Sequence, residues 1–531
     1  MAKFIFVTGG VVSGLGKGIT ASSLGMLLTL RGFRVTIQKL DPYINVDPGT
    51  MSPYEHGEVF VTNDGAETDL DIGHYERFLG RNLTANSSFS SGQIWLNVIN
   101  KERKGEYLGK TIQIVPHITN EIIDTMKSVA NDVDIVIVEI GGTVGEIESS
   151  TFIEAIRQFR NELGDQDSLS VHVTLVPFLE MSGEIKTKPT QISVRELGSM
   201  GVFTDIIVCR SSANVQLDTE ARKKIALFCN LGSHENVIHN YDSRSIYEVP
   251  LTLKEQNFDD IVLKKLGLCA PQPDLKDWRN MVKHMFNGYP KKTVAIVGKY
   301  VSVPDAYLSV VESVNIAGIS CKIKPEIKLV DSEEIEKHGA AKCLKGVDAI
   351  IVPGGFGNRG IEGKIKTAEY ARKNNIPYLG ICLGMQIAVI EFARNVAGIK
   401  GATSSEFDPT AANPVIDIME EQKQVSTKGA TMRLGLYDCK IKSGTKVAKL
   451  YGKTDIKERH RHRFEFNNKY REQLEKAGLK IVGVNEDADL VEIIELPNHK
   501  YYVASQFHPE FLSKPNKPHP LFVGLMNAIR N

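Results

Sequence analysis

Short apolar runs alternate with longer amphipathic segments along the chain. Phe4–Thr8, Arg34–Lys39 and Asp132–Glu139 are rich in apolar and β-branched residues, and a helical pattern ending at Leu30 separates the first two. Continuous apolar runs of this length are typical of strands that are buried on both faces of a sheet. Strands that alternate with helices are typical of βαβ units. The pattern therefore predicts an α/β fold with a mostly parallel sheet covered by helices.

The same alternation returns after a break in the pattern. Around residues 269–292 the periodicity loosens to prolines, glycines and one predicted helix, Leu275–Phe286. A chain of 531 residues is also too long for one hydrophobic core. We therefore expect two α/β domains with mostly parallel sheets, at residues 1–268 and 293–531, joined by a linker at 269–292. In the second domain the predicted strands include Thr293–Gly298, Asp348–Ile351, Ile376–Leu379 and Tyr501–Ser505, and Ile387–Val396 is a predicted helix.

Composition narrows the functional classes. Lys+Arg and Asp+Glu number 64 each, and this zero net charge argues against a general nucleic-acid-binding protein. The chain contains no apolar stretch long enough for a transmembrane helix. The first residues run directly into a strand pattern, which does not fit a signal peptide. Seven cysteines without paired spacing are typical of reduced thiols, so we expect a cytoplasmic protein.

Cys382 stands between a predicted strand and a predicted helix, in the frame Gly380-Ile-Cys-Leu-Gly384. The two glycines permit a turn too sharp for larger side chains, which leaves the sulfur exposed. The start of the helix favours the thiolate. A lone cysteine is more often a small buried hydrophobic residue, so the interpretation as a nucleophile depends on its partners.

Suitable partners are present downstream and upstream. His508 follows the predicted strand Tyr501–Ser505 and can serve as the base, while Glu510 can fix its tautomer. The backbone N–H groups of Val352–Gly357, together with that of Leu383, suit an oxyanion hole. These residues predict catalysis by a cysteine–histidine–glutamate triad.

A glycine-rich loop follows the first predicted strand and carries Lys17 where the next helix begins. Backbone N–H groups in such a loop bind phosphate, and the lysine adds a positive charge. The match to the usual P-loop is imperfect, because Gly18 stands where Ser or Thr would bind magnesium. The alternative is a turn that only connects strand and helix.

Three further segments carry polar residues that suit a ligand site. Residues 41–58 and 64–77 form long irregular loops, which are usually functional inside a compact domain. Glu139 ends a predicted buried strand, where a carboxylate faces the ligand crevice of an open sheet. Lys186–Gln191 sets two lysines and hydroxyls around a proline, which predicts an anion site in a turn, although an ordinary surface loop is the alternative.

Residues 293–531 resemble the class I (triad) glutamine amidotransferases in the segments around Cys382, His508 and Glu510. Over both predicted domains the chain resembles the CTP synthase family, on the glycine-rich loop Gly9–Gly18, Asp41–Asp47 and Asp69–Phe78. The resemblance implies an enzyme that phosphorylates UTP with ATP and aminates it to CTP with ammonia from glutamine. It also implies Mg²⁺, activation by GTP, feedback inhibition by CTP and assembly as a homotetramer.

The resemblance also implies binding residues. It assigns ATP to Gly14, Leu15, Gly16, Lys17, Gly18, Ile19, Lys39, Asp71, Tyr241, Asp242 and Ser243, and the metal to Asp71 and Glu139. It assigns UTP or CTP to Ser13, Glu146, Ile147, Glu148, Lys186, Thr187, Lys188, Pro189, Thr190, Gln191 and Lys224. It assigns glutamine to Tyr54, Gly354, Gly355, Leu383, Gly384, Met385, Gln386, Glu406 and Arg463.

Some alternatives remain open at the level of sequence. The basic run Glu458–Arg463 resembles a nucleic-acid patch, but it lacks interleaved aromatic residues, so we favour a site for the α-carboxylate of glutamine. A corrinoid amide synthase also joins an ATP domain to a triad amidotransferase, although it needs no second triphosphate site such as Lys186–Gln191. A non-catalytic scaffold is the remaining alternative, and it would be expected to lack the nucleophile or the base. No nucleic-acid or membrane partner is expected.

Overall fold

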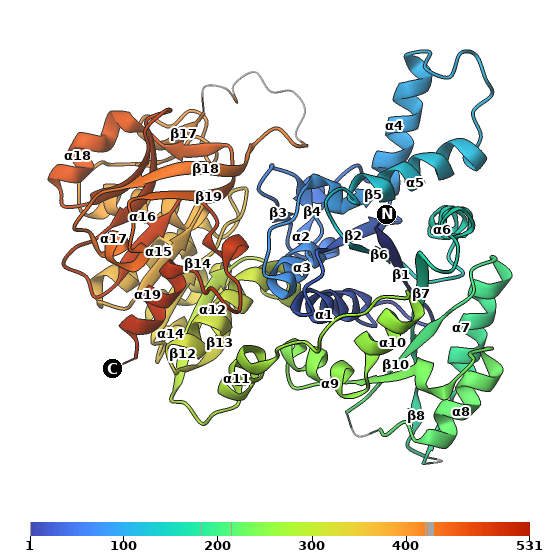
Figure 1. The fold of residues 1–531 in the computed structure, drawn as a ribbon. Helices are drawn as coiled ribbons and strands as arrows, with labels where there is room; N and C mark the ends of the chain where they lie inside the picture. Colours follow the sequence, from blue (N-terminus) through green and yellow to red (C-terminus); the bar gives the residue numbers. More distant parts are fainter. Residues whose placement is uncertain (1, 182, 214, 420–421, 423–428, 531) are drawn as a thin grey trace. The chain divides into compact units, whose positions relative to one another are not determined.

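The computed structural model describes residues 2–181, 183–213, 215–419, 422 and 429–530. These residues form two α/β units. The first unit comprises Met1–Asp47 and His74–Val282, and the second comprises Pro48–Gly73 and Lys283–Asn531. Figure 1 shows the elements of both units coloured along the sequence. The segment Pro48–Gly73 therefore groups with the second unit, although the residues on either side of it belong to the first.

The first unit is built on a seven-stranded sheet in which every neighbouring pair of strands is parallel. The strand order is β11 (Val237–Tyr241), β10 (Ile206–Ser211), β7 (Ser168–Leu175), β1 (Lys3–Gly9), β6 (Ile135–Ile140), β2 (Val35–Asp41) and β5 (Ser88–Ser90). Its helices are α1 (Lys17–Leu30), α4 (Ser91–Arg103), α5 (Thr119–Ser128), α6 (Ser150–Leu163), α7 (Lys188–Ser199), α8 (Thr219–Phe228), α9 (Val249–Glu255) and α10 (Phe258–Lys265). A short hairpin joins β8 (Phe178–Leu179) to β9 (Glu184–Ile185).

Burial on both faces explains the continuous apolar runs in these strands. Val136 and Val138 of β6 belong to a core with Phe152 and Phe159 of α6. Ile137, between them, points to the other face, where it lies close to Gly25 of α1. Because successive side chains of a strand point to opposite faces, both sets of positions must be apolar. The predicted fold of this half is confirmed.

The second unit is built on a nine-stranded mixed sheet. The strands β13 (Lys324–Asp331), β12 (Lys291–Gly298), β14 (Ala349–Val352), β15 (Tyr378–Ile381) and β23 (Tyr502–Ser505) pair in parallel. The sheet continues with β22 (Leu490–Glu495), β21 (Lys480–Asn485), β18 (Arg433–Ile441) and β19 (Asp455–His462), which pair antiparallel. The parallel half agrees with the prediction, and the antiparallel extension adds strands that the sequence pattern did not predict.

Helices cover both faces of the parallel half of this sheet. One core contains residues of α15 (Ile361–Lys373) and α16 (Leu383–Asn395), and the other contains residues of α12 (Leu308–Ser320), α17 (Lys446–Tyr451) and α19 (Pro520–Ala528). The remaining short elements are α2 (Pro53–His56), α13 (Ser332–His338), α14 (Ala340–Cys343), α18 (Arg471–Lys476), β3 (Phe60–Val61), β4 (Glu67–Thr68), β16 (Thr403–Ser404), β17 (Pro414–Ile418) and β20 (Phe464–Phe466). Two helices cross the division between the units, α3 (Asp71–Leu79) and α11 (Lys276–Met285).

The segment Pro48–Gly73 is held in the second unit by two arginines of β19, of which Arg459 is buried and Arg461 is partly buried. Arg459 donates from Nε to Asn63 Oδ1 at 2.6 Å and from Nη1 to Val61 O at 3.0 Å. Arg461 donates from Nε to Glu67 Oε1 at 2.7 Å. Charge-assisted hydrogen bonds of this kind are the stronger ones in proteins, so the basic run of β19 binds this hairpin.

Candidate active sites

Cys382 occupies a strained turn between β15 and α16. Its φ of +52° is unusual for a residue with a Cβ, and its N–H donates to Ser505 O of β23 at 2.7 Å. A Cβ at Gly384 would lie 2.0 Å from Val352 O, and one at Gly380 would lie 2.6 Å from Gly384 O. Both glycines are therefore required for the turn, as predicted. The helix begins at Leu383, directly after Cys382, and therefore four residues before the predicted start at Ile387.

The imidazole of His508 is held by Glu510. His508 Nδ1 donates to Glu510 Oε1 at 2.7 Å, and the ring stacks on Phe511 with centroids 4.9 Å apart. Its Nε2 has no hydrogen-bond partner among the described residues and, like Cys382, lies beside Gly354. Burial by itself lowers the pKa of His508, but its interactions with Glu510 and with Cys382 outweigh burial and raise the pKa to about 10. A protonated imidazole facing the sulfur favours the thiolate form of a nucleophile.

Two contacts of the sulfur were not predicted. Cys382 Sγ donates to Arg461 O at 3.7 Å, and Gln506 Nε2 donates to Cys382 Sγ at 3.6 Å. Gln506 stands two residues before the predicted base His508, and this proximity in the sequence could have indicated the contact. Nothing in the sequence indicated the contact with the Arg461 carbonyl, because Arg461 belongs to β19, a strand of the antiparallel extension that was not predicted.

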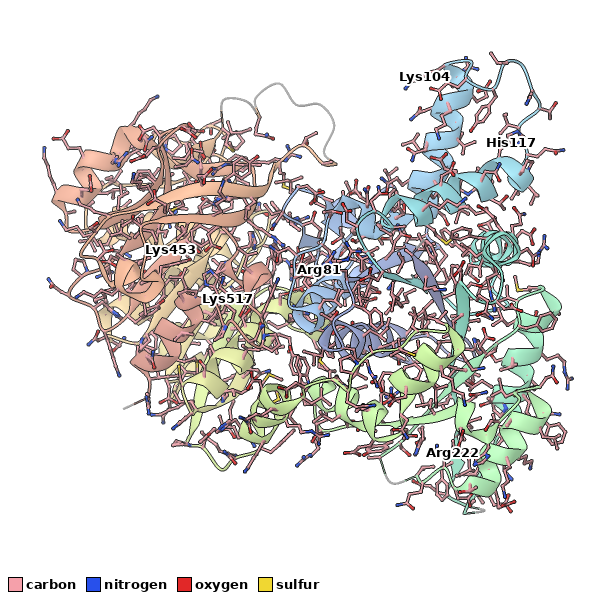
Figure 2. All side chains as sticks on the ribbon, in the orientation of Figure 1. Arg81, Lys104, His117, Arg222, Lys453 and Lys517 are labelled. Carbon is pink, nitrogen blue, oxygen red and sulfur yellow. The ribbon has the colours of Figure 1, made fainter. Side chains whose placement is uncertain are left out.

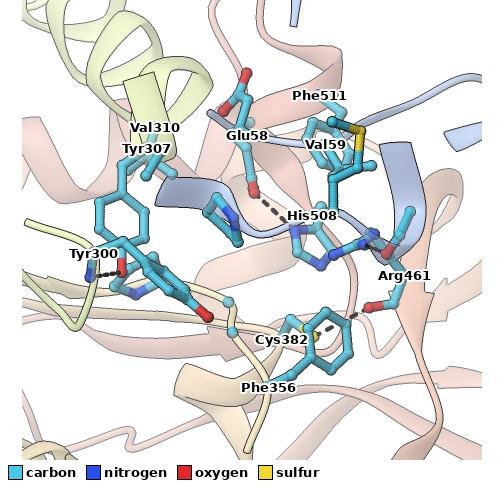
Figure 3. A pocket seen from close by; sticks show the side chains of 18 of the residues that line it. Glu58, Val59, Tyr300, Tyr307, Val310, Phe356, Cys382, Arg461, His508 and Phe511 are labelled. Atoms are coloured by element: carbon cyan, nitrogen blue, oxygen red, sulfur yellow. Dashed lines mark hydrogen bonds and ion pairs between the residues drawn. The ribbon is translucent and has the colours of Figure 1, made fainter. Parts of the chain in front are cut away.

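A cavity of about 390 Å³ opens beside this cysteine, within the second unit. Figure 3 shows Cys382, His508 and Phe356 around it, with Tyr300 and Tyr307 on another side. The lining residues are Gly49, Thr50, Met51, Ser52, Pro53, Glu58, Val59, Tyr300, Ala306, Tyr307, Val310, Pro353, Gly354, Gly355, Phe356, Cys382, Arg461, His508, Glu510 and Phe511. A cavity of this size with a few convergent polar groups suits a small-molecule ligand.

The structure brings only part of the predicted glutamine set to the cavity wall. Gly354 and Gly355 line it, whereas Tyr54 belongs to the short helix α2 and Glu406 to the turn after β16. Tyr54 Oη donates to Lys299 O at 2.8 Å, and Glu406 Oε1 accepts from Gly357 N–H at 2.7 Å.

The other predicted glutamine contacts lie deeper or are engaged elsewhere. Leu383, Gly384 and Met385 are buried in the first turns of α16, so only their backbone can take part. Gln386 Nε2 donates to Phe464 O at 2.8 Å. Arg463 donates to Gln422 Oε1 at 2.5 Å and to Thr431 Oγ1 at 2.6 Å. Their roles stay predictions.

In the first unit the glycine-rich loop leads into α1. Gly14 and Gly16 have φ of +71° and +81°, a backbone conformation that favours glycine and turns successive N–H groups toward one side. Lys17 is 9% exposed and donates from Nζ to Gly142 O at 2.7 Å. A Cβ at Gly9 would lie 2.6 Å from Lys17 Cδ, so this glycine gives the lysine room. The arrangement suits a phosphate group at the start of α1.

Glu139 is 2% exposed and lies at the carboxyl end of β6. It accepts a hydrogen bond from the Tyr75 hydroxyl, and its Oε1 lies 3.6 Å from Lys39 Nζ. The second predicted metal carboxylate, Asp71, is part of the second unit, so each is described by itself. Within the described ranges no group of three or more His, Cys, Asp or Glu side chains is arranged to hold a metal. A buried carboxylate still fits Mg²⁺, which binds through one or two carboxylates and takes its other oxygens from phosphates and water.

The predicted UTP segment opens α7. Lys188 and Pro189 form its first turn, so the predicted proline turn is in fact the start of a helix. Pro is well suited to this position because its missing N–H has no intrahelical acceptor there. Thr190 Oγ1 donates to Leu175 O at 3.2 Å, which ties α7 to the carboxyl end of β7.

A buried histidine that the sequence analysis missed links this helix to the glycine-rich loop. His172 Nδ1 lies 2.9 Å from Thr8 Oγ1, and its Nε2 lies 2.8 Å from Ser193 Oγ of α7. Burial and the charge of Lys17 lower the pKa of His172 to about 3, so the ring is neutral and bridges the two hydroxyls. A Cβ at Gly10 would lie 1.7 Å from Ser193 Oγ, which makes the contact between loop and helix direct.

The other predicted nucleotide residues lie on loops, apart from Lys224 in α8 and Tyr241 in β11. Ser13, Glu146, Ile147, Glu148 and Lys224 are exposed, and Glu146 Oε2 accepts from Thr143 N–H at 2.9 Å. Tyr241 ends β11, and Asp242 after it pairs with Arg210 at 2.6 Å. Gly9, Lys39, Glu139 and Tyr241 thus all stand at the carboxyl ends of parallel strands, where open α/β sheets bind ligands.

Comparison with known proteins matches two parts of the chain to two family models. Residues 3–268 match the model described as CTP synthase N-terminus, and residues 302–528 match that of glutamine amidotransferase class-I. The chain is 60% identical over 530 residues to CTP synthase of Carboxydothermus hydrogenoformans, which covers 99% of this chain and 98% of that protein. It is 59% identical over 533 residues to CTP synthase of Caldanaerobacter subterraneus subsp. tengcongensis, covering 100% of this chain and 99% of that one.

Among solved structures, the chain is similar to the glutaminase domain of Trypanosoma brucei CTPS with bound acivicin. The two are 43% identical, the TM-score is 0.42, and the match covers 45% of this chain and 93% of that one.

A cysteine elbow with its histidine and glutamate, in a region that matches the class I model, defines the second unit as a glutamine amidotransferase of that class. The chain as a whole belongs to the CTP synthase family, since both family models and near-full-length relatives agree. The family predicted from the sequence is confirmed. The comparisons do not support the two alternatives, a corrinoid amide synthase and a non-catalytic scaffold. The described helices are each too short or too polar to cross a bilayer.

Proposed function

We propose that this protein converts UTP to CTP, using ATP and the ammonia released from glutamine. The observation that carries the proposal is the strained Cys382 turn facing His508 and Glu510, in a chain whose other half presents a phosphate-binding loop. Purified protein should form CTP from UTP and ATP with glutamine, and also with ammonium salts. A protein that forms no CTP with either nitrogen source contradicts the proposal.

The glutaminase reaction follows from the geometry. The Cys382 thiolate attacks the side-chain amide carbon, and the resulting oxyanion accepts from backbone N–H groups of the Gly354–Gly355 loop and Leu383. His508, protonated and oriented by Glu510, gives its proton to the leaving ammonia. Water then hydrolyses the thioester with His508 as the base. Glu406 binds the α-ammonium group of glutamine, and Arg463 its α-carboxylate.

The nucleotide reaction uses the first unit. The glycine-rich loop and Lys17 bind the triphosphate of ATP, and Lys17 and Lys39 stabilise the charge that spreads over the transferring phosphoryl group. The phosphate goes to O4 of UTP, and ammonia displaces it. Glu139 would help to hold Mg²⁺, which supplies charge neutralisation for phosphate oxygens when bound. Ser13, Lys186–Gln191 and Lys224 bind the triphosphate of UTP or CTP.

We also propose a homotetramer in the cytoplasm that GTP activates. An arm of the first unit supports self-association, because it exposes several large apolar side chains: Leu96, Ile99, Leu108, Ile114 and Val115. Figure 1 shows this arm, α4 and α5, projecting from the first unit's sheet, and Figure 2 labels Lys104 and His117 on it. Unpaired thiols at all seven cysteines suit a reducing compartment. Light scattering with and without nucleotides tests the tetramer, and GTP titration of glutamine-dependent turnover tests the activation.

Feedback by CTP gives a testable prediction at Glu148. UTP and CTP share a triphosphate and differ at position 4 of the base, where cytosine carries a donor amino group. Glu148 is exposed on the loop after β6 and offers a carboxylate to that donor. Glu148→Ala should weaken CTP inhibition roughly tenfold or more, the value of a lost charge-assisted hydrogen bond, and should raise the KM for UTP less.

The inhibition constant of CTP and the KM for UTP should both be measured on purified Glu148→Ala and on the control Glu220→Ala. Glu220 is an exposed glutamate of α8 that pairs with Lys223. The control should leave both constants unchanged. Equal shifts of the inhibition constant and the KM in Glu148→Ala would mean that the two bases share one pocket.

A further inference from the structure

Lys364 of α15 is buried in a way that is unusual for a lysine. Its side chain is 0% exposed, and its Nζ has no hydrogen-bond partner among the described residues. A Cβ at Gly363 would lie 1.9 Å from Ser332 O, so α15 packs closely against the start of α13. Buried amines are normally paired, because desolvation of the charged form is costly. Lys364 therefore calls for a functional explanation.

The amine lies against the loop that carries the proposed oxyanion hole. A Cβ at Gly355 would be 3.7 Å from Lys364 Nζ. Lys299 Nζ donates to Phe356 O of the same loop, and Glu406 accepts from Gly357 N–H at 2.7 Å. Lys299 and Glu406 thus bind this loop directly, at Phe356 and Gly357, and the amine of Lys364 lies beside it at Gly355.

Charges of both signs face Lys364. Burial, followed by repulsion from Lys299, lowers the pKa of Lys364 to about 7, while Glu406 and Asp331 act in the opposite direction and Arg359 adds repulsion. Burial also raises the pKa of Glu406. The protonation of one buried amine therefore changes the charge around Glu406 close to neutral pH.

The other acidic groups on the elements packed against α15 already have partners. Glu336 of α13 accepts from Gly363 N–H at 3.0 Å. Glu391 of α16 pairs with Arg372 at 2.6 Å. Glu333 of α13 lies 3.5 Å from Arg359. Glu406 is the acidic group that both acts on the charge of Lys364 and accepts a hydrogen bond from the loop that lines the cavity.

We propose that Lys364 is a positioning residue that controls, through Glu406, how tightly the site binds the α-ammonium group of glutamine. This inference rests on the proposed function, in which Glu406 binds that group. When Lys364 is neutral, the negative charge of Glu406 pairs with the α-ammonium group of glutamine without competition from this lysine. A protonated Lys364 places a competing positive charge beside the same carboxylate.

The direction of the pH effect follows. As pH falls from 8 to 6, Lys364 gains its proton and the affinity for glutamine decreases. We expect the KM for glutamine to rise about tenfold over this interval, since opposite and like charges a few ångströms apart in a partly buried site interact strongly. Turnover at saturating glutamine should change only as the triad itself titrates.

The test compares wild type, Lys364→Met and Lys366→Met in the glutaminase reaction from pH 6 to 8. Methionine keeps the length of the side chain and removes the charge. Lys366 is an exposed lysine of the same helix and is the matched control. Wild type and Lys366→Met should show the rise in KM, whereas Lys364→Met should keep one low KM throughout. The same rise in Lys364→Met would overturn the proposal.

Two further measurements separate positioning from a merely structural role. Ammonia-dependent CTP formation should be equal in the three proteins at every pH. The monoamide of glutaric acid, which is glutamine without the α-amino group, should inhibit wild type with a constant that does not change between pH 6 and 8. If the inhibition constant of the monoamide in wild type rises between pH 8 and pH 6 as much as the KM for glutamine does, the proposal is overturned. Absence of glutamine hydrolysis at every pH would instead contradict the proposed function.

Discussion

Cys382→Ala is expected to abolish CTP formation with glutamine and to leave CTP formation with ammonium unchanged. In the proposed mechanism the sulfur is the nucleophile of the glutaminase reaction, and removal of a nucleophile from a catalytic triad typically lowers turnover by about a thousandfold or more. The proposed nucleotide site belongs to the other unit and would take external ammonia directly. Alanine also suits the turn poorly, because φ at this position is +52°, but no more poorly than cysteine does.

The measurement is CTP formation with each nitrogen source, together with glutamate release. Cys343→Ala is a matched control, since Cys343 is a partly exposed cysteine of α14 in the same unit. It should retain both activities. Loss of ammonia-dependent synthesis in folded Cys382→Ala would contradict the division of the reaction between two sites.

Lys17→Ala is expected to lower CTP formation about a hundredfold or more with either nitrogen source. Both routes need the same phosphorylated UTP, and a positive charge aimed at a transferring phosphoryl group contributes a few kcal/mol to the transition state. Lys17 is buried, and its Nζ donates to Gly142 O, so the amine points toward the loop that follows β6. Glutaminase activity without nucleotides should change little.

Lys127→Ala provides the comparison, because Lys127 is an exposed lysine of α5 that pairs with Glu162 at 2.7 Å. Initial rates with glutamine and with ammonium should be measured at saturating ATP and UTP, beside a thermal unfolding curve. If ammonia-driven turnover of Lys17→Ala stays within threefold of wild type, Lys17 only stabilises the start of α1.

Much of this enzyme could be predicted from local sequence patterns. Apolar runs such as Asp132–Glu139 indicated strands because a strand buried on both faces needs apolar residues at consecutive positions. Gly380 and Gly384 indicated the turn at Cys382 because only glycine fits so close to the backbone. The glycine-rich loop before Lys17 indicated the start of α1 for the same kind of reason. Turns and periodicities depend on neighbours in the sequence, which a sequence displays directly.

Contacts between distant segments were decided by the tertiary structure alone. The grouping of Pro48–Gly73 with the second unit depends on Arg459 and Arg461, some 400 residues downstream. His172 carries no motif in the sequence, and only packing sets it between Thr8 and Ser193. Lys364 sits in a helix beside exposed lysines, and no pattern distinguishes it from them. Burial, charge and pKa arise from residues that folding brings together, so the sequence by itself determined the chemistry of the triad and the loops, and the structure decided what surrounds them.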